Sequence, residues 1–141
     1  MEKSTDELMN VLKSHKDYKT FFQEEIGEMI FKSLDEYLCV LLKEKDLKKS
    51  EVIDKSNLDK NYAYQLFNGI KKNPSRNKIL MLAFGMKLNL SETRKLLKIA
   101  GLPDLYPRFP RDSVIIFCIN NNKNLIEVNE MLDDYSLNIL E

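Results

Sequence analysis

The sequence contains few cysteines, glycines and prolines, and it contains no tryptophan. Its two cysteines, Cys39 and Cys118, lie far apart and form no C-x-x-C pair, so we expect neither a zinc site nor a redox motif. Free cysteines of this kind are typical of a reduced, cytoplasmic protein, and Cys39 is interpreted as a small core residue. With four glycines and four prolines in 141 residues, the chain has few turn residues, which favours an all-α fold over a sheet.

Long apolar runs and catalytic motifs are also missing. No run approaches the roughly 18 apolar residues that a membrane helix needs, and the first residues, MEKSTDEL, lack the apolar stretch of a signal peptide. The chain has one histidine, no nucleophile motif, no glycine-rich phosphate loop and no clustered metal ligands. We therefore expect a protein that is not an enzyme, needs no cofactor or metal, and does not bind a membrane.

The net charge is zero, but the charges are distributed unevenly. Residues 43–101 carry fourteen Lys and Arg against six Asp and Glu. Residues 1–42 carry five against nine, and residues 102–141 carry three against seven. A basic centre between acidic flanks is typical of a nucleic-acid-binding segment within a larger body. A charged run is more often a solvated surface, so this pattern needs support from motifs.

Apolar residues recur at intervals of three and four along most of the chain, which predicts helices. A short helix should follow Ser4, the residues from Phe21 to Ile30 are compatible with a helix, and S-x-x-E at Ser33 resembles a capping box. The central helices are expected at about 34–45, 49–55, 60–68, 76–86 and 92–100. The run 114–119 could be a strand, but no other segment would pair with it, so we interpret it as a buried helix followed by a helix after Asn124.

Several polar residues and glycines mark the joints between the central helices. Asn57 is suited to a left-handed turn, Asp59 to a cap, and Gly69 to the end of the helix at 60–68. Ser91 is expected to cap the fifth central helix. We divide the chain into an N-terminal helical extension (1–32), a central domain (33–101) and a C-terminal helical extension (102–141).

Five segments of the central domain carry a family resemblance, at residues 47–52, 57–59, 68–69, 74–83 and 88–91. Together they resemble the Xre/Cro-like helix-turn-helix family of phage and bacterial repressors. LKKSEV at 47–52 stands where that family has Leu-Ser-Gln-x-Glu-Leu, and Asn68-Gly69 stands where it has Asn-Gly at the end of the recognition helix. Lys49 replaces a Gln that braces the recognition helix in many relatives and touches a phosphate. The resemblance implies a five-helix core that binds DNA.

In this interpretation the helix at 60–68 enters the major groove. Its polar outer face has side chains that can hydrogen-bond base edges, since Asn and Gln pair with adenine and Lys donates to guanine. The base-reading candidates are Lys60, Asn61, Tyr64 and Gln65. The candidates for phosphate contact are Lys48, Lys49, Asn68, Lys71, Lys72, Arg76 and Lys78.

The predicted function is sequence-specific binding of double-stranded DNA by a transcriptional regulator that acts as a repressor. The alternative is an antitoxin or adaptor, whose helix-turn-helix domain autoregulates its operon while the flanks bind a protein partner. The apolar residues of both flanks predict a homodimer, although they could instead complete one monomeric core. An arginine–aspartate pair drawn from Arg108, Arg111 and Asp112 is expected to pin the proline-containing loop at 102–110.

Overall fold

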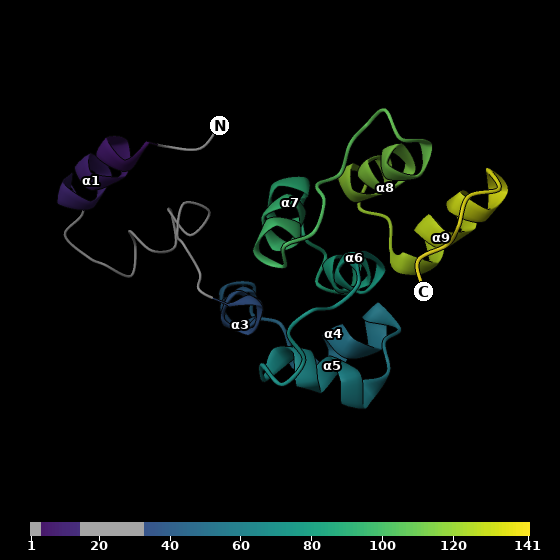
Figure 1. Cartoon of the computed structure of the whole chain (residues 1–141), viewed down its shortest axis with the longest axis horizontal. Coiled ribbons are helices and arrows are strands. Elements are labelled where there is room, and N and C mark those ends of the chain that lie inside the picture. The colour runs from purple at the N-terminus through teal and green to yellow at the C-terminus, as the bar shows by residue number, and fades with distance from the viewer. Residues whose placement is uncertain (1–3, 15–32) are drawn as a thin grey trace. The chain divides into compact units, whose positions relative to one another are not determined.

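The computed structural model describes residues 4–14 and 33–141 and divides the chain into two compact units, 1–31 and 32–141. Every regular element in the described residues is an α-helix (Figure 1), so the predicted all-α class is confirmed. The helices are α1 (Thr5–Ser14), α3 (Leu34–Glu44), α4 (Lys49–Ser56), α5 (Lys60–Phe67), α6 (Arg76–Gly85), α7 (Leu90–Ile99), α8 (Pro110–Asn120) and α9 (Leu125–Asp134).

The described part of the first unit is α1, and its predicted position after Ser4 is confirmed. The Ser4 hydroxyl accepts a hydrogen bond from the Glu7 N–H at 3.1 Å, which satisfies one free donor of the first turn. The helix-compatible residues from Phe21 to Ile30 lie outside the described residues. None of the described helices is long and apolar enough to cross a membrane.

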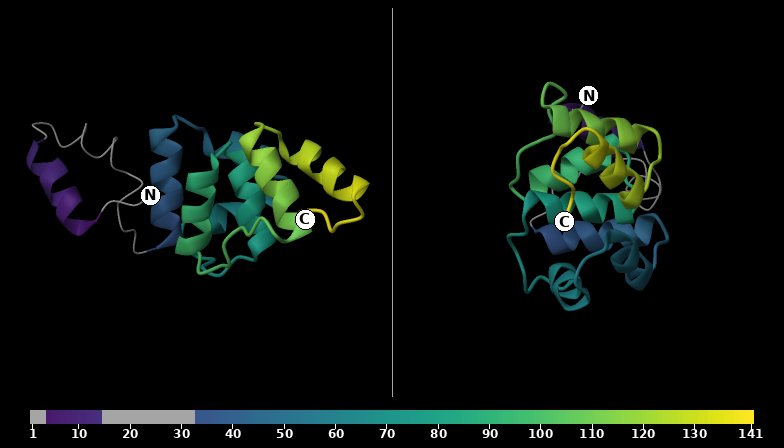
Figure 2. Two further views of the ribbon diagram at one scale, coloured as in Figure 1. Left: turned by 90° about the horizontal axis from the view of Figure 1, so that it is seen from above. Right: turned by 90° about the vertical axis from the view of Figure 1, so that its right-hand side faces the viewer.

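Helix α6 lies at the centre of the second unit, as Figures 1 and 2 show. Its residues from Ile79 to Gly85 are all buried, so the helix has no solvent-facing side over that stretch. Helices α4, α7 and α9 pack on α6, α3 packs on α5 and α7, and α8 packs on α7 and α9. A helix that is apolar all round is typical of a buried central element, and the other helices present one apolar face each.

Helices α4 and α6 are in close contact at Gly85. A Cβ atom at this position would collide with the Ser56 side chain and lie 2.8 Å from the Val52 carbonyl oxygen. Ser56 is fully buried, and its hydroxyl donates to the same Val52 oxygen at 2.7 Å. The lack of a side chain at Gly85 is therefore what allows α4 to rest on α6.

The apolar run 114–119 forms the greater part of α8, so its interpretation as a helix is confirmed. Val114, Ile115, Cys118 and Ile119 are buried, at spacings of three and four, against the rest of the unit. Phe117 points outward and is 49% exposed. Residues 102–141 belong to the same compact unit as residues 33–101, so part of the predicted C-terminal extension completes a shared core.

Three local expectations are wrong. The Ser33 side chain makes no capping hydrogen bond to α3. Asn89, not Ser91, caps α7, because Asn89 and Glu92 exchange backbone and side-chain hydrogen bonds as a capping box. Cys39 is exposed instead of buried, since the inward stripe of α3 runs through Leu34, Tyr37, Leu38, Leu41 and Leu42 and leaves position 39 outside.

Candidate nucleic-acid interface

The joint between α4 and α5 consists of Asn57, Leu58 and Asp59. Asn57 is left-handed, with φ 53° and ψ 32°, a conformation that asparagine tolerates better than most residues. An oxygen of the Asp59 carboxylate accepts a hydrogen bond from the Tyr62 N–H at 3.0 Å and so caps α5. Both predictions are confirmed, and together they fix the residue at which α5 begins.

Helix α5 has one buried face and one exposed face. Ala63, Leu66 and Phe67 are buried against the core. Lys60 and Asn61 are exposed in the first turn, Tyr64 is 36% exposed, and Gln65 is partly exposed. The four residues predicted to read bases therefore all reach solvent along about 9 Å of helix.

The C-terminal end of α5 is closed by Asn68 and Gly69. The Asn68 amide oxygen accepts a hydrogen bond from the Ile70 N–H at 3.1 Å, and Gly69 has a positive φ of 84°. A Cβ at Gly69 would lie 3.0 Å from a carboxylate oxygen of Asp35 in α3, so the turn packs closely on that helix. The predicted glycine stop is confirmed, because the left-handed Gly69 follows the last residues of α5.

Lys71 and Lys72 follow this turn and are both exposed. The Lys71 N–H donates to the Gln65 carbonyl oxygen at 3.0 Å, which holds the backbone of the loop against α5. Neither lysine forms an ion pair within the described part of the chain. The structure thus brings two uncompensated positive charges next to the outer face of α5.

Lys49 and Lys78 each contact an aromatic ring of α5. The Lys49 ammonium lies 5.5 Å from the centroid of Phe67, and the Lys78 ammonium lies 5.9 Å from that of Tyr62. Both side chains are partly buried, whereas Lys48, the N-cap residue of α4, is exposed. Lys49 therefore joins the start of α4 to the end of α5 by a cation–π contact.

Arg76 is turned away from α5, unlike the other predicted phosphate contacts. Its guanidinium makes two hydrogen bonds of 2.9 Å to the Asp112 carboxylate in α8, and it also donates to the carbonyl oxygens of Pro103 and Asp104. The Asp112 side chain is only 5% exposed. These bonds occupy the fork of the guanidinium, so Arg76 pins the proline-containing loop to α6 and is not in position to contact phosphate.

The same loop is held at two further points. Arg94 of α7 pairs with Asp104 at 2.9 Å, and Arg111 donates to the Asn77 side chain and to the carbonyl oxygens of Asn138 and Ile139. Partial burial by itself raises the pKa of Asp104, but the hydrogen bonds from Arg94 and Leu105 and the charge of Arg76 hold that pKa below its usual value. An arginine–aspartate pair does hold the loop, but its arginine is Arg76 of α6 and not Arg108 or Arg111, the candidates predicted from the sequence.

Sequence reasoning missed the partners of Arg76 and the close contact at Gly85. Arg76 and Asp112 are separated by 36 positions, so no local spacing relates them. Gly85 stands inside a continuous apolar run, where an isolated glycine is a signal of close helix packing. The polar Asn-x-x-Glu spacing at Asn89 and Glu92 was likewise a signal for the cap that the structure forms.

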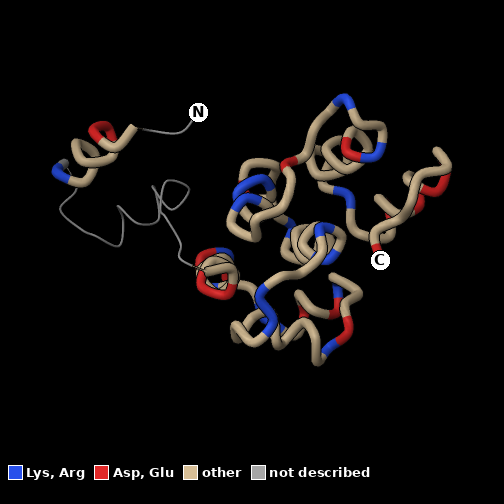
Figure 3. Tube along the Cα trace, viewed as in Figure 1, with Lys and Arg blue, Asp and Glu red and all other residues tan. Residues whose placement is uncertain are grey.

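Charged residues are distributed unevenly over the second unit. Figure 3 shows basic residues on α6, α7 and the segment between α5 and α6, and acidic residues on α3 and α9. Helix α4 carries Glu51 and Asp54 as well as lysines. Helix α5 and helix α8 lie on different sides of α6 in Figure 1. Within residues 4–14 and 33–141, no group of His, Cys, Asp and Glu side chains could hold a metal ion.

No family model, no curated protein and no solved structure matches the chain. The resemblance to Xre/Cro-like repressors therefore depends on the motif residues alone. What the chain can do has to be argued from the geometry and charge of α4, α5 and the loop that follows.

Proposed function

We propose that the protein binds double-stranded DNA sequence-specifically, with α4 and α5 acting as a helix-turn-helix and α5 lying in the major groove. The observation that carries the proposal is the outer face of α5. It is polar and solvent-accessible, it begins at a capped three-residue joint, and two exposed lysines without ion pairs follow it. A groove-reading helix needs this combination of a rigid position and free hydrogen-bonding side chains.

Residues in the first two turns of α5 would read base edges. Asn61 and Gln65 can each pair bidentately with adenine, and Lys60 can donate to the O6 and N7 atoms of guanine. Tyr64 offers a ring that can contact a thymine methyl group. The inner face of α5 is buried by Ala63, Leu66 and Phe67, so these outer side chains would be presented from a fixed backbone.

Phosphate contacts would fix the register of α5 on the duplex without reading sequence. Lys71 and Lys72 lie just beyond the C-terminal end of α5, and Lys48 precedes Lys49, whose ammonium contacts Phe67 at that same end. These lysines would therefore approach the phosphate backbone near one end of α5. Asn68, Lys49 and Lys78 are secondary candidates, because each already has a partner within the protein. Arg76 is left out of this set because of its bonds to Asp112.

A protein of this kind would act as a cytoplasmic transcriptional regulator, and more specifically as a repressor that occupies an operator. One recognition helix covers only a few base pairs. We therefore expect two copies to bind half-sites about 34 Å apart on one face of the duplex. In such an arrangement the operator would be palindromic.

The second candidate is an adaptor or antitoxin that uses the same helices to bind DNA and the C-terminal helices to bind a protein. An apolar groove between α8 and α9 favours it. The two candidates share the DNA surface and differ only in what residues 102–141 contact.

The salt dependence of DNA binding tests the proposed phosphate surface. The double substitution Lys71→Ala/Lys72→Ala should weaken binding to every duplex by a similar factor, because phosphate contacts carry no sequence information. It should also reduce the slope of log K against log salt by about one to two units, since each lost contact accounts for roughly 0.9. Fluorescence anisotropy of a labelled duplex at several salt concentrations measures both quantities.

The matched control is Arg108→Ala/Lys123→Ala, which removes the same charge from residues 102–141. This variant should keep the wild-type slope, because the two side chains lie outside α4, α5 and the loop after α5. Equal slopes for the wild type and the Lys71/Lys72 variant would exclude the phosphate surface. An equal fall in slope for both variants would show that only net charge matters.

A further inference from the structure

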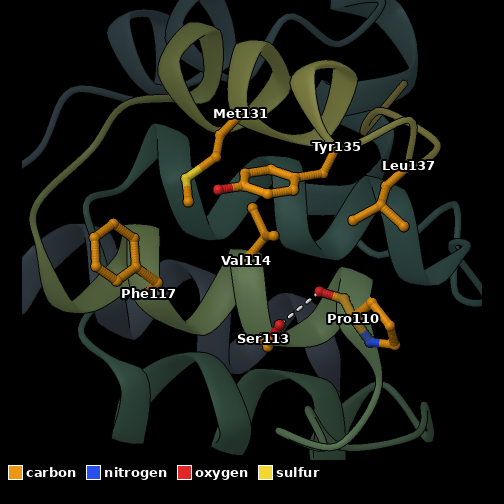
Figure 4. A pocket seen from close by; sticks show the side chains of 7 residues that line it. All are labelled: Pro110, Ser113, Val114, Phe117, Met131, Tyr135 and Leu137. Carbon is orange, nitrogen blue, oxygen red and sulfur yellow. Dashed lines mark hydrogen bonds between the residues drawn. The ribbon is translucent and has the colours of Figure 1, made fainter.

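An apolar groove lies between α8 and α9, on the C-terminal part of the second unit (Figure 4). Its cavity volume is about 390 Å³. In Figure 4, Val114 and Tyr135 face each other across it, with Phe117 at one end and Leu137 at the other. The full lining consists of Pro110, Ser113, Val114, Phe117, Met131, Tyr135 and Leu137.

Two large side chains of the groove are left in water. Phe117 is 49% exposed and Tyr135 is 66% exposed. Exposed aromatic side chains that border one concave apolar surface are typical of a binding site for another molecule. In sequence, Pro110, Ser113 and Phe117 follow the spacing i, i+3, i+7 along α8, and Met131 and Tyr135 are four apart on α9.

The α9 edge of the groove is acidic. Glu127, Glu130 and Asp134 are exposed and recur at spacings of three and four, which places them in a stripe beside Met131 and Tyr135. Lys123 compensates only one of them, through a pair with Glu127 at 3.8 Å. The α8 edge carries Ser113 and Asn120 instead of charges. The groove is thus apolar at its floor and negative along one side.

This charge decides which occupant fits. A second copy of this chain would form a two-fold interface in which the same patch meets itself, so the acidic stripe would face either the same stripe or the uncharged α8 edge of the other copy. Neither arrangement supplies a positive charge to the stripe. Two acidic stripes that face each other would disfavour such a dimer by about 2 kcal/mol or more. DNA is excluded for the same reason, because its phosphates would face the stripe. A partner with positive charge beside its apolar face has the complementary surface.

We propose that the α8–α9 groove docks an amphipathic helix of another protein, with Lys or Arg residues along one edge of its apolar face. A third helix laid between two neighbouring helices can bury one apolar stripe against both of them. The lining spans about two helical turns, which matches apolar side chains at i, i+3 or i+4, and i+7 of the partner. The basic edge lies against Glu130 and Asp134. This proposal deepens the second candidate function, in which the C-terminal helices bind a protein, and it does not depend on DNA binding.

A display library of helical peptides tests the proposal with the full-length protein as bait. The library keeps leucine at i, i+3 and i+7 and varies the flanking positions among Lys, Glu and Gln. Selection should enrich Lys on one flank. Affinity for the selected peptide should fall about tenfold or more in Phe117→Ser, which removes a large apolar side chain from one end of the groove. It should fall about fivefold in Asp134→Lys and decrease as salt is raised.

Two matched controls separate the groove from general effects. Ile126→Ser removes another exposed apolar side chain of α9 without touching the lining, and Asp133→Lys makes the same charge change at the position beside Asp134. Both should bind the selected peptide within about threefold of the wild type.

Circular dichroism should show equal helix content in all four variants, since the substituted side chains are exposed. The proposal is overturned if no peptide is enriched, if acidic flanks are enriched as often as basic ones, or if Phe117→Ser leaves affinity unchanged. It is also overturned if sedimentation shows a dimer that Phe117→Ser dissociates, because the occupant is then a second copy. Duplex binding by the same variants is measured separately, and its presence or absence leaves each of these outcomes unaffected.

Discussion

The α5 surface and the α8–α9 surface belong to one compact unit and differ in charge and in how their exposed apolar residues are arranged. The α5 surface exposes Lys60, Lys71 and Lys72 together with Tyr64 and Ile70, which are 36% and 66% exposed, while Ala63, Leu66 and Phe67 face the core. The α8–α9 surface is acidic, and it exposes Phe117 and Tyr135. The net charge of the whole chain is zero, and this value describes neither surface. Local charge and apolar exposure therefore indicate possible partners better than the net charge does.

The two surfaces are mechanically connected through α6. Helix α4 rests on α6 at Gly85, near its C-terminal end, and the loop before α8 is pinned to Arg76 at its N-terminal end. If the two surfaces bind different partners, α6 and its contacts should support both. Changes at these contacts should therefore affect the stability of the whole unit, whereas changes on either surface should affect one binding activity.

The largest effect is expected from Gly85→Ala. The added methyl group collides with the Ser56 side chain and crowds the Val52 carbonyl oxygen, which lies 2.8 Å from the position of the new atom. Helix backbones cannot move apart without opening the core, so the free energy of unfolding should fall by about 3 kcal/mol or more. Urea unfolding followed by circular dichroism measures the change.

Gly101→Ala is the matched control for that substitution. Gly101 has a positive φ of 70°, but a Cβ there meets no atom within 4 Å. Gly101→Ala should therefore lower the free energy of unfolding only through backbone strain, by about 1 kcal/mol. Ser56→Gly combined with Gly85→Ala should recover part of the lost stability, because it removes the atoms nearest to the new methyl group. Equal unfolding midpoints for Gly85→Ala and Gly101→Ala would contradict the close contact of α4 and α6.

Asp112→Ala should have the next largest effect. It leaves the Arg76 guanidinium without its carboxylate and the Tyr106 N–H without its acceptor, which lies at 2.9 Å. Loss of these partly buried bonds should lower the free energy of unfolding by about 2 to 3 kcal/mol. The control Asp134→Ala removes an exposed carboxylate and should change stability by about 0.5 kcal/mol or less.

The same variant tests the role of Arg76 in DNA binding. Arg76 binds the loop before α8 and is not expected to contact DNA. The loss of its carboxylate partner in Asp112→Ala should therefore leave the salt slope of DNA binding unchanged. A steeper slope in Asp112→Ala would show that the freed guanidinium contacts phosphate.

Tyr37 should make stability sensitive to alkaline pH. The side chain is 3% exposed, and burial, together with the nearby negative charge of Glu92, raises its pKa well above the usual value. Because the folded pKa lies above the unfolded value of about 10, the native state keeps a proton that the unfolded chain loses. Its contribution is therefore complete below about pH 10 and declines by up to about 1.4 kcal/mol per pH unit above it.

Urea unfolding at pH values between 9 and 11.5 measures this decline, and Tyr37→Phe is the reference. The variant lacks the titrating group, so its stability should fall less steeply over the same range. Parallel curves for the two proteins would contradict a buried, protonated Tyr37.

Much of the local structure could be predicted because short-range chemistry determines it. The spacing of three and four from Leu34 to Leu42 identified the buried face of α3, and Asn57, Asp59 and Gly69 marked the limits of α5. Each of these residues acts on the backbone within a few positions of itself. The exposed face of α5 followed from the same periodicity, as did the outward position of its candidate base-reading residues.

The remaining features depend on contacts between distant segments. Arg76 looked like part of the basic segment, but Asp112 is brought to it only when α8 packs on α7 and α9. The position of Gly85 against Ser56 depends on where α4 crosses α6. The groove at Phe117 arises because α8 buries four residues of its apolar run, leaves Ile116 half-buried and exposes Phe117, and the sequence does not show which residue is exposed.

Selection from a random duplex library tests the central claim that α5 reads DNA sequence. The wild-type protein should enrich one short motif, arranged as a palindrome if two copies bind. Asn61→Ala and Gln65→Ala should each lose about 1–3 kcal/mol on that motif, at particular base pairs, while their binding to unrelated duplexes barely changes. No enriched motif, or an equal loss of affinity on the motif and on unrelated DNA, would contradict the claim.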